Sequence, residues 1–142
     1  MTVRKSIYFL AALAVAAALL LLPTACKTPK LTVADQQMER GEYFDASNTY
    51  KKVYSKLKSR EERPLRGEVA YKLATCYRKL NRFANASAAY QNAIRYEYPD
   101  SMAYYYLGRS LQAEGKYKQA IEAYDTFLTW RPKDELAKEG KA

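Results

Sequence analysis

The stretch GKYKQAIEAYDTF, residues 115–127, has two counterparts in the same chain. NRFANASAAYQNA occupies residues 81–93, and GEYFDASNTYKKV occupies residues 41–53. All three begin with glycine or asparagine, have an aromatic residue two positions later, an alanine after three more, and a tyrosine after a further four. The second and third copies lie 34 residues apart. A fixed period of this length is typical of repeat architectures, in which small helical units stack on one another.

Apolar residues on both sides of Gly115 recur with the spacing of α-helices. They predict one helix before this glycine and a second after it that ends at Pro132. The expected packing residues are Tyr104, Leu107, Gly108 and Leu111 in the first helix, and Tyr117, Ala120, Ile121, Tyr124, Phe127 and Leu128 in the second.

Residues 101–134, with an aromatic-xx-Leu-Gly pattern, Gly-x-Tyr, alanine, aromatic and proline in order, resemble the tetratricopeptide repeat (TPR). The resemblance implies an all-α solenoid of helix–turn–helix units. About three repeats are expected, at residues 27–60, 67–100 and 101–134, followed by a C-terminal helix within a TPR domain that spans 32–142. In the second repeat Asn81 replaces the turn glycine, which it can do because asparagine tolerates positive φ.

The first repeat is the least regular of the three. Pro29 prevents a helix before it, so the first helix is expected at about 31–40. Its expected packing residues are Val33, Ala34 and Gln37. Six extra residues, EERPLR at 61–66, separate the first and second repeats. The second helix of the first repeat is expected to continue past Leu57, and Pro64 to mark the start of the next helix.

Residues 1–25 have the form of a secretory signal peptide, with two cations, an apolar run and a small-residue end. The apolar run 7–22 would form a helix of about 24 Å, shorter than the ~30 Å hydrocarbon core of a bilayer. The small residues before Cys26 resemble a bacterial lipobox, although Pro23 stands where leucine is usual. This resemblance implies a covalent lipid on Cys26 and a lipidated tether at 26–31. Cleavage by ordinary signal peptidase and an uncleaved membrane anchor are the alternatives.

The composition argues against catalysis and metal binding. The chain has no histidine and two cysteines, which removes the commonest general base and rules out a four-cysteine zinc site. There is no phosphate-binding loop, no dinucleotide motif and no paired nucleophile and base. Cys76 is expected to be a small buried thiol. We therefore expect no enzyme activity, no metal and no cofactor other than the lipid.

The formal charge of +9 suits nucleic acid, an anionic membrane surface or an acidic partner. Export from the cytoplasm argues against nucleic acid and leaves anionic lipid, peptidoglycan or an acidic protein.

The TPR resemblance also implies a binding groove, lined by positions 2, 5, 9, 12 and 13 of each first helix. These positions hold Glu68, Tyr71, Thr75, Arg78 and Lys79 in the second repeat, and Met102, Tyr105, Arg109, Gln112 and Ala113 in the third. Two tyrosines and three cations suit an extended peptide with acidic groups or a C-terminal carboxylate. TPRs that bind chaperone tails have lysine at position 5 and asparagine at position 9, and this chain has neither.

Lipobox and repeats together resemble the N-terminal TPR regions of Bacteroidota outer-membrane lipoproteins, a group that includes OmpA-associated and type IX secretion proteins. Lys27, which follows Cys26, fits transport to the outer membrane. The resemblance implies a lipid-anchored scaffold on the periplasmic face that helps assemble an envelope or secretion complex. The alternatives are a lipoprotein for assembly of β-barrels or pilus secretins, and direct binding of peptidoglycan or another anionic envelope polymer.

Overall fold

The computed structural model describes residues 29–142, which form seven α-helices and no β-strand. The helices are α2 (Pro29–Glu39), α3 (Tyr43–Tyr54), α4 (Arg63–Lys79), α5 (Phe83–Arg95), α6 (Met102–Ala113), α7 (Tyr117–Trp130) and α8 (Glu135–Lys141). Within this range no helix has the length and hydropathy needed to cross a membrane. The expected signal peptide and Cys26 lie outside the described residues.

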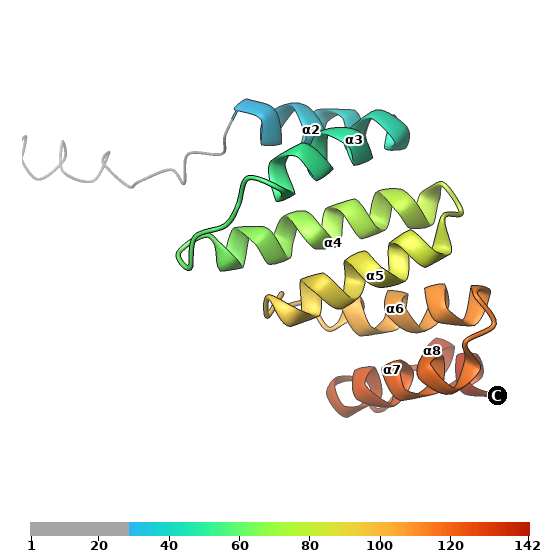
Figure 1. The fold of residues 1–142 in the computed structure, drawn as a ribbon. Helices are drawn as coiled ribbons and strands as arrows, with labels where there is room; N and C mark the ends of the chain where they lie inside the picture. The colour runs from blue at the N-terminus through green and yellow to red at the C-terminus, as the bar shows by residue number, and fades with distance from the viewer. Residues whose placement is uncertain (1–28) are drawn as a thin grey trace, which may run out of the picture.

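The helices stack in the order in which they occur in the chain, from α2 at one end to α8 at the other (Figure 1). Each helix packs mainly on the helix before it and the helix after it, and α8 also touches α6. Three helix pairs, α2–α3, α4–α5 and α6–α7, therefore correspond to the three expected repeats. The predicted all-α solenoid is confirmed.

Each pair is closed by a turn residue with positive φ: 77° at Gly41, 55° at Asn81 and 76° at Gly115. At the asparagine turn, the backbone N–H of Arg82 donates to the carbonyl of Tyr77 over 2.9 Å, a hydrogen bond that ends α4 in a Schellman motif. The predicted replacement of glycine by asparagine in the second repeat is confirmed.

Alanines and tyrosines of the three second helices form the centre of the stack. Ala46, Ala86 and Ala120 are at most 2% exposed, and the equivalent tyrosines, Tyr50, Tyr90 and Tyr124, are fully buried. Small residues bring neighbouring helices close together, and the large rings fill the space between successive pairs.

The first repeat differs from expectation in two details. Helix α2 begins at Pro29, because proline fits the first turn, where no N–H donor is needed. Leu31 and Ala34 are its buried residues, whereas Val33, expected to pack, is 45% exposed.

The end of α3 is also different from expectation. The helix stops at Tyr54 instead of continuing past Leu57, which is nevertheless buried. The chain turns here because the carboxylate of Glu62 accepts the backbone N–H groups of Lys58 and Ser59, each over 2.9 Å. Pro64 lies in the first turn of α4, as predicted.

The C-terminal end of the stack leaves apolar side chains exposed. Tyr117 and Ile121, expected to pack, are 65% and 37% exposed. The equivalent of Tyr117 in the first pair is Tyr43, which lies half-buried with Lys79 of the next pair 6.0 Å from its ring centroid. The seven-residue α8 does not provide such a cover. Two further exposed apolar residues at this end are Trp130 and Leu136.

Candidate functional site

The first helices of the three pairs, α2, α4 and α6, supply the residues expected to line a groove, and we call their common surface the groove face. Side chains join these helices directly. The ammonium of Lys72 lies 2.9 Å from the carboxylate of Asp35, which links α4 to α2. The guanidinium of Arg78 lies 4.2 Å from the ring centroid of Tyr106, which links α4 to α6. The first helices of neighbouring repeats therefore contact one another through their side chains, although of these four residues only Arg78 was predicted to line the groove.

The buried tyrosines of the second helices extend from the core toward this face, and their hydroxyl groups bond to side chains of the first helices. Tyr50 donates to Asp35 over 2.7 Å, and Tyr124 donates to Gln112 over 3.0 Å. Each of these tyrosines buries its ring and holds a polar side chain of the groove face in place. Gln112, a predicted groove residue, is thus half-buried and already engaged.

Arg78 is fixed by two neighbours, Tyr90 and Tyr106. Its Nε donates to the hydroxyl of Tyr90 over 3.3 Å, and its guanidinium covers Tyr106. Tyr90 also lies 3.2 Å from the hydroxyl of Thr75, and its ring stacks on that of Tyr106 at 5.9 Å. None of the ion pairs between described residues includes Arg78. Its positive charge therefore lies on the groove face without a carboxylate partner in that part of the chain.

Tyr71 lies half-buried within an aromatic cluster that includes Tyr90, the residue to which Arg78 donates. Its ring stacks on Tyr98 at 4.4 Å and meets Tyr90 edge-on at 5.6 Å. Burial raises the pKa of Tyr71 above its ordinary value, so the residue is neutral and forms a flat apolar platform with a hydroxyl.

The third repeat places its predicted residues less evenly. Tyr105 is only 6% exposed, and its ring packs against Tyr124 and Phe127, so it offers little surface to a partner. Its hydroxyl accepts a hydrogen bond from Arg109 over 3.2 Å, and this arginine is exposed. Met102 is half-buried at the start of α6.

Arg78 and Arg109 meet at a small cavity of about 280 Å³ between α4 and α6. It is lined by Arg78, Asn81, Phe83, Tyr106, Arg109 and Ala113. The lining residues thus include two arginines, an asparagine and a tyrosine, a combination that suits a carboxylate, which arginine binds through two parallel hydrogen bonds. Lys79 is directed toward the first pair, 6.0 Å from the ring of Tyr43, and does not line this cavity.

Sequence reasoning missed three residues of the groove face: Asp35, Lys72 and Tyr106. Lys72 and Tyr106 occupy position 6 of the second and third repeats, so their matching positions were a usable signal. Lys72 also pairs with Glu68 at 2.8 Å. Burial alone would lower the pKa of Lys72, but the hydrogen bonds that its ammonium donates to the carboxylates of Glu68 and Asp35 hold this pKa above its ordinary value. This end of the groove face is charge-compensated, and the arginine end is not.

Other candidate chemistry in the described part of the chain is sparse. Cys76 is fully buried, as predicted, and burial raises the pKa of its thiol to about 11, so it is an unreactive packing residue. Among residues 29–142 no three metal-ligating side chains lie together.

Comparisons with known proteins agree with this fold. Residues 71–135 match the tetratricopeptide repeat family model. No curated protein matches the chain in sequence. Several solved structures are similar in fold, and all share low sequence identity with the chain. The first TPR of Spaghetti (RPAP3) bound to the HSP90 peptide SRMEEVD has a TM-score of 0.62 at 20% identity, covering 79% of this chain and 86% of that one.

Two further structures give the same result. The second TPR domain of human RPAP3, in complex with the HSP70 peptide SGPTIEEVD, has a TM-score of 0.65 at 18% identity, covering 79% of this chain and 88% of that one. The Sgt2 TPR domain from Aspergillus fumigatus has a TM-score of 0.61 at 20% identity, covering 80% and 76%. The chain has the TPR fold.

Proposed function

We propose that the chain is a non-catalytic protein-interaction scaffold whose groove face binds an extended acidic segment of a partner protein. The observation that carries this proposal is the cavity between α4 and α6, where Arg78 and Arg109 converge without a carboxylate from the described residues. Tyr71 and Tyr106 add aromatic surface on the same side. Two proteins of similar fold bind the acidic peptides SRMEEVD and SGPTIEEVD, which supports a peptide as the ligand.

The mode of binding differs from a chaperone-tail clamp. Positions 5 and 9 hold Tyr71 and Thr75 in the second repeat, and Tyr105 and Arg109 in the third, where that clamp needs lysine and asparagine. Thr75 is also engaged, since its hydroxyl donates to the carbonyl of Tyr71 over 3.0 Å. Side-chain carboxylates that pair with Arg78 and Arg109 therefore fit the groove better than a terminal carboxylate held by such a clamp.

A direct test compares peptides that differ only in charge. The wild-type chain is titrated with a seven-residue glutamate peptide and with its glutamine equivalent. We expect the glutamate peptide to bind at least about tenfold more tightly, and its affinity to fall with salt as exposed charges are screened. Arg78→Gln with Arg109→Gln should abolish this preference, with helical content checked by circular dichroism.

The matched control is Lys118→Gln with Lys133→Gln, which removes the same charge from exposed positions outside the cavity. If this control loses as much affinity as the groove variant, net charge binds the peptide and the groove is not the site.

We place the scaffold in a bacterial envelope, as a lipoprotein on the periplasmic face of the outer membrane. The sequence of residues 1–26 supports this placement, and the partner would then be an envelope protein in a secretion complex, such as type IX secretion. Cys26→Ser should leave an unprocessed precursor and abolish incorporation of labelled palmitate. Continued labelling of the serine variant would refute the lipid anchor while leaving the groove proposal intact.

Crosslinking pull-downs from envelope membranes distinguish the remaining alternatives. One prominent protein captured by the wild type and lost from the groove variant would support the scaffold. Its identity separates secretion from assembly of β-barrels or pilus secretins, and capture of peptidoglycan fragments instead would support direct polymer binding.

A further inference from the structure

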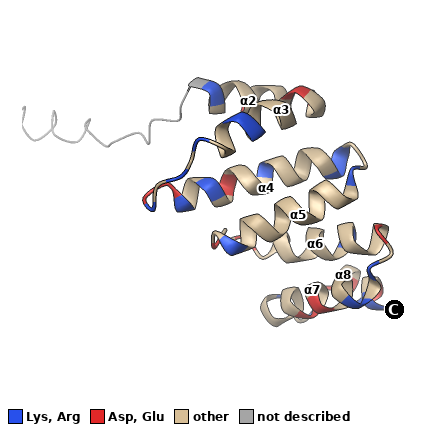
Figure 2. Ribbon diagram, in the orientation of Figure 1, with Lys and Arg blue, Asp and Glu red and all other residues tan. Residues whose placement is uncertain are grey.

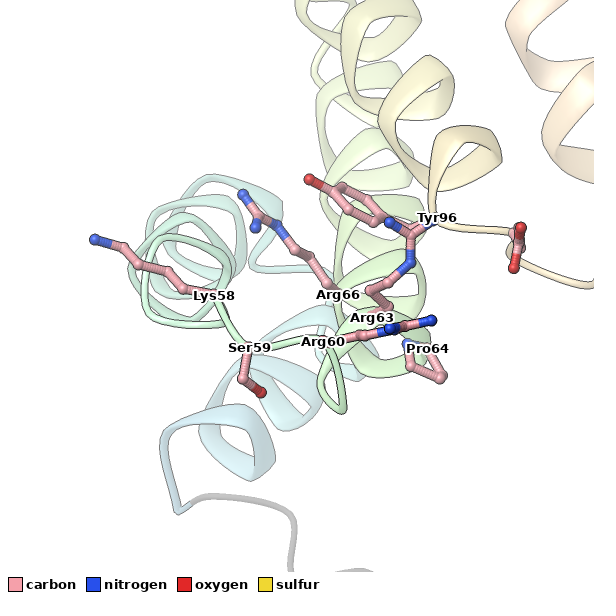
Figure 3. Close-up of a pocket in the computed structure, with 8 residues that line it drawn as sticks. Lys58, Ser59, Arg60, Arg63, Pro64, Arg66 and Tyr96 are labelled. Carbon is pink, nitrogen blue, oxygen red and sulfur yellow. The ribbon is translucent and has the colours of Figure 1, made fainter.

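A second concentration of positive charge lies away from the groove face, where the chain turns from α3 into α4. The six residues that interrupt the repeat, 61–66, form the end of this turn and the first turn of α4. A cavity of about 830 Å³ opens here, and its walls come from this turn, the first turns of α4 and the end of α5 (Figure 3). It is lined by Lys58, Ser59, Arg60, Arg63, Pro64, Arg66, Tyr96 and Glu97.

Arg66 is the fixed element of this cavity. Its guanidinium carbon lies 4.7 Å from the ring centroid of Tyr54 and 4.8 Å from that of Tyr96, so the group packs on two aromatic rings that themselves meet edge-on. Gly67 permits this arrangement, because a Cβ there would lie only 3.1 Å from the carbonyl oxygen of Tyr96. A guanidinium held in this way loses little freedom when it binds a ligand. Its Nε is buried and has no hydrogen-bond partner among the described residues.

Two further arginines extend the site toward solvent. The guanidinium of Arg63 lies 5.4 Å from the ring centroid of Tyr96 and donates to the carbonyl of Arg95 over 3.4 Å. Figure 3 shows Arg60 beside Pro64 and Arg63 directed toward Tyr96, whereas the side chains of Arg66 and Lys58 extend to the other side of α4. Arg60, Arg63 and Arg66 all line the same cavity, and we call these three residues the arginine site.

Three carboxylates, those of Glu61, Glu62 and Glu97, belong to the same region of the chain as the arginine site or line its cavity, but none forms an ion pair with it. Glu62 accepts two backbone N–H groups of the turn, and these hydrogen bonds lower its pKa. Glu97 is the one carboxylate that lines the cavity, and Glu61 is exposed. No ion pair between residues of the described range includes Arg60, Arg63 or Arg66. The guanidinium groups of the arginine site therefore have no direct carboxylate partner among the described residues, and an anion that enters the cavity could pair with them.

We propose that the arginine site binds a phosphate group. A phosphate carries more charge than a carboxylate and offers oxygens in several directions, which suits three guanidinium groups that approach from different turns. Two sources carry this chemistry: a soluble phosphate ester, and the phosphodiester of a lipid headgroup. The start of α2 and the α3–α4 turn lie on the same side of the stack (Figure 1), and Figure 2 shows lysines and arginines concentrated along that edge. A membrane that meets this edge would bring headgroups to the site.

The test follows the arginine side chains directly. The full-length chain, in detergent and with isotope-labelled arginine, is titrated with glycerol 3-phosphate. The arginine Nε–H resonances are recorded by nuclear magnetic resonance during the titration. We expect saturable shifts that chloride at equal ionic strength does not reproduce. Arg60→Gln with Arg63→Gln should weaken binding at least about tenfold, because both side chains are exposed and their loss leaves the packing of Arg66 intact. Arg66→Lys should also weaken binding, since it retains charge but loses the planar fork.

The control, Lys118→Gln with Lys133→Gln, has the same change in net charge and should bind as the wild type does. A second arm measures binding to phosphatidylcholine vesicles with and without phosphatidylglycerol. Loss of the phosphatidylglycerol preference in the arginine variant identifies a lipid headgroup, and unchanged vesicle binding with lost glycerol phosphate binding identifies a soluble ester. Absence of saturable shifts in the wild type, or equal losses in the control, overturns the proposal, and thermal unfolding of each variant verifies that it is folded.

Discussion

A single tyrosine in each repeat links the core to the groove face. The rings of Tyr50, Tyr90 and Tyr124 are fully buried, while their hydroxyls bond to polar residues of the neighbouring first helix. Phenylalanine would fill the same space but would leave those polar groups without partners, which is the costlier arrangement. The residue choice in the core therefore also determines how the groove is organised.

This burial predicts a loss of stability at alkaline pH. Burial raises the pKa of Tyr124 to about 12, and burial also holds the pKa of Tyr50 and Tyr90 above the ordinary value of 10.0. Above pH 10 the unfolded chain loses phenolic protons that the folded chain retains, so the free energy of unfolding falls as pH rises through this range. Urea unfolding between pH 8 and pH 11 measures this fall.

Tyr124→Phe should make the fall less steep, and Tyr117→Phe should leave it unchanged, because Tyr117 is 65% exposed. Equal slopes for the wild type and the Tyr124 variant would show that other groups cause the alkaline loss.

The alanines that occupy the same position in each repeat give a second prediction at this scale. Ala86 and Ala120 lie where helices approach closely, so replacing either with leucine should lower the free energy of unfolding by about 1–3 kcal/mol. Lys118→Leu, at an exposed position of α7, should cost little. Chemical denaturation of the three variants checks this, and similar losses at all three would contradict the register.

At the scale of the helix, the turn residues carry most of the information about where elements end. Asn81 has a φ of 55°, which an alanine adopts at a cost of about 1–2 kcal/mol. Asn81→Ala should therefore destabilise the stack by about 1 kcal/mol, and Asn81→Gly should not, because glycine has no Cβ to strain. Asn85→Ala, at an exposed position of α5, is the matched control, and thermal unfolding is the measurement. A loss for the glycine variant equal to that for alanine would show that the asparagine side chain, and not its backbone, matters here.

The sequence predicted the helix pairs and their turns because period, turn residues and prolines are local signals. It did not predict the end of α3, because Glu62 binds the backbone of the turn from outside the repeat pattern. The repeat pattern also predicted that Tyr117 and Ile121 are buried, although both are exposed. The pattern marks the positions that a helix buries when it has neighbours on both sides. Whether a neighbour covers the position is a tertiary property that the period does not contain.

The candidate site was predicted to a similar degree. Arg78 and Arg109 were predicted because they occupy positions 12 and 9 of their repeats, which line the groove in TPRs, and both line the cavity. Tyr105 was placed in the groove for the same reason, although its ring is buried. The arginine site was missed because two of its residues, Arg63 and Arg66, belong to an insertion with no counterpart in the other repeats, and Arg60 directly precedes that insertion.

At the scale of the molecule, nearly all helix–helix contacts join neighbours in the chain, which makes stability nearly one-dimensional. The central helices α4 and α5 have a neighbour on both sides, so their amides should exchange most slowly with deuterium, and those of α2 and α8 fastest. Leu31→Ala, which removes a fully buried side chain of α2, should speed exchange in α2 and α3 much more than in α6 and α7. Native-state hydrogen exchange with mass spectrometry measures this, and a uniform increase along the chain would indicate a single cooperative unit.

Trp130 gives the molecule a built-in reporter of one end. It is the chain's one tryptophan, it is 70% exposed at the end of α7, and it lies at a small cavity with residues of the α5–α6 turn. Selectively excited tryptophan emission therefore records the detachment of the last pair, whereas far-ultraviolet circular dichroism averages over every helix. In a stack whose ends open separately the two melting curves need not coincide, and their separation would give the cooperativity of the solenoid without any added label.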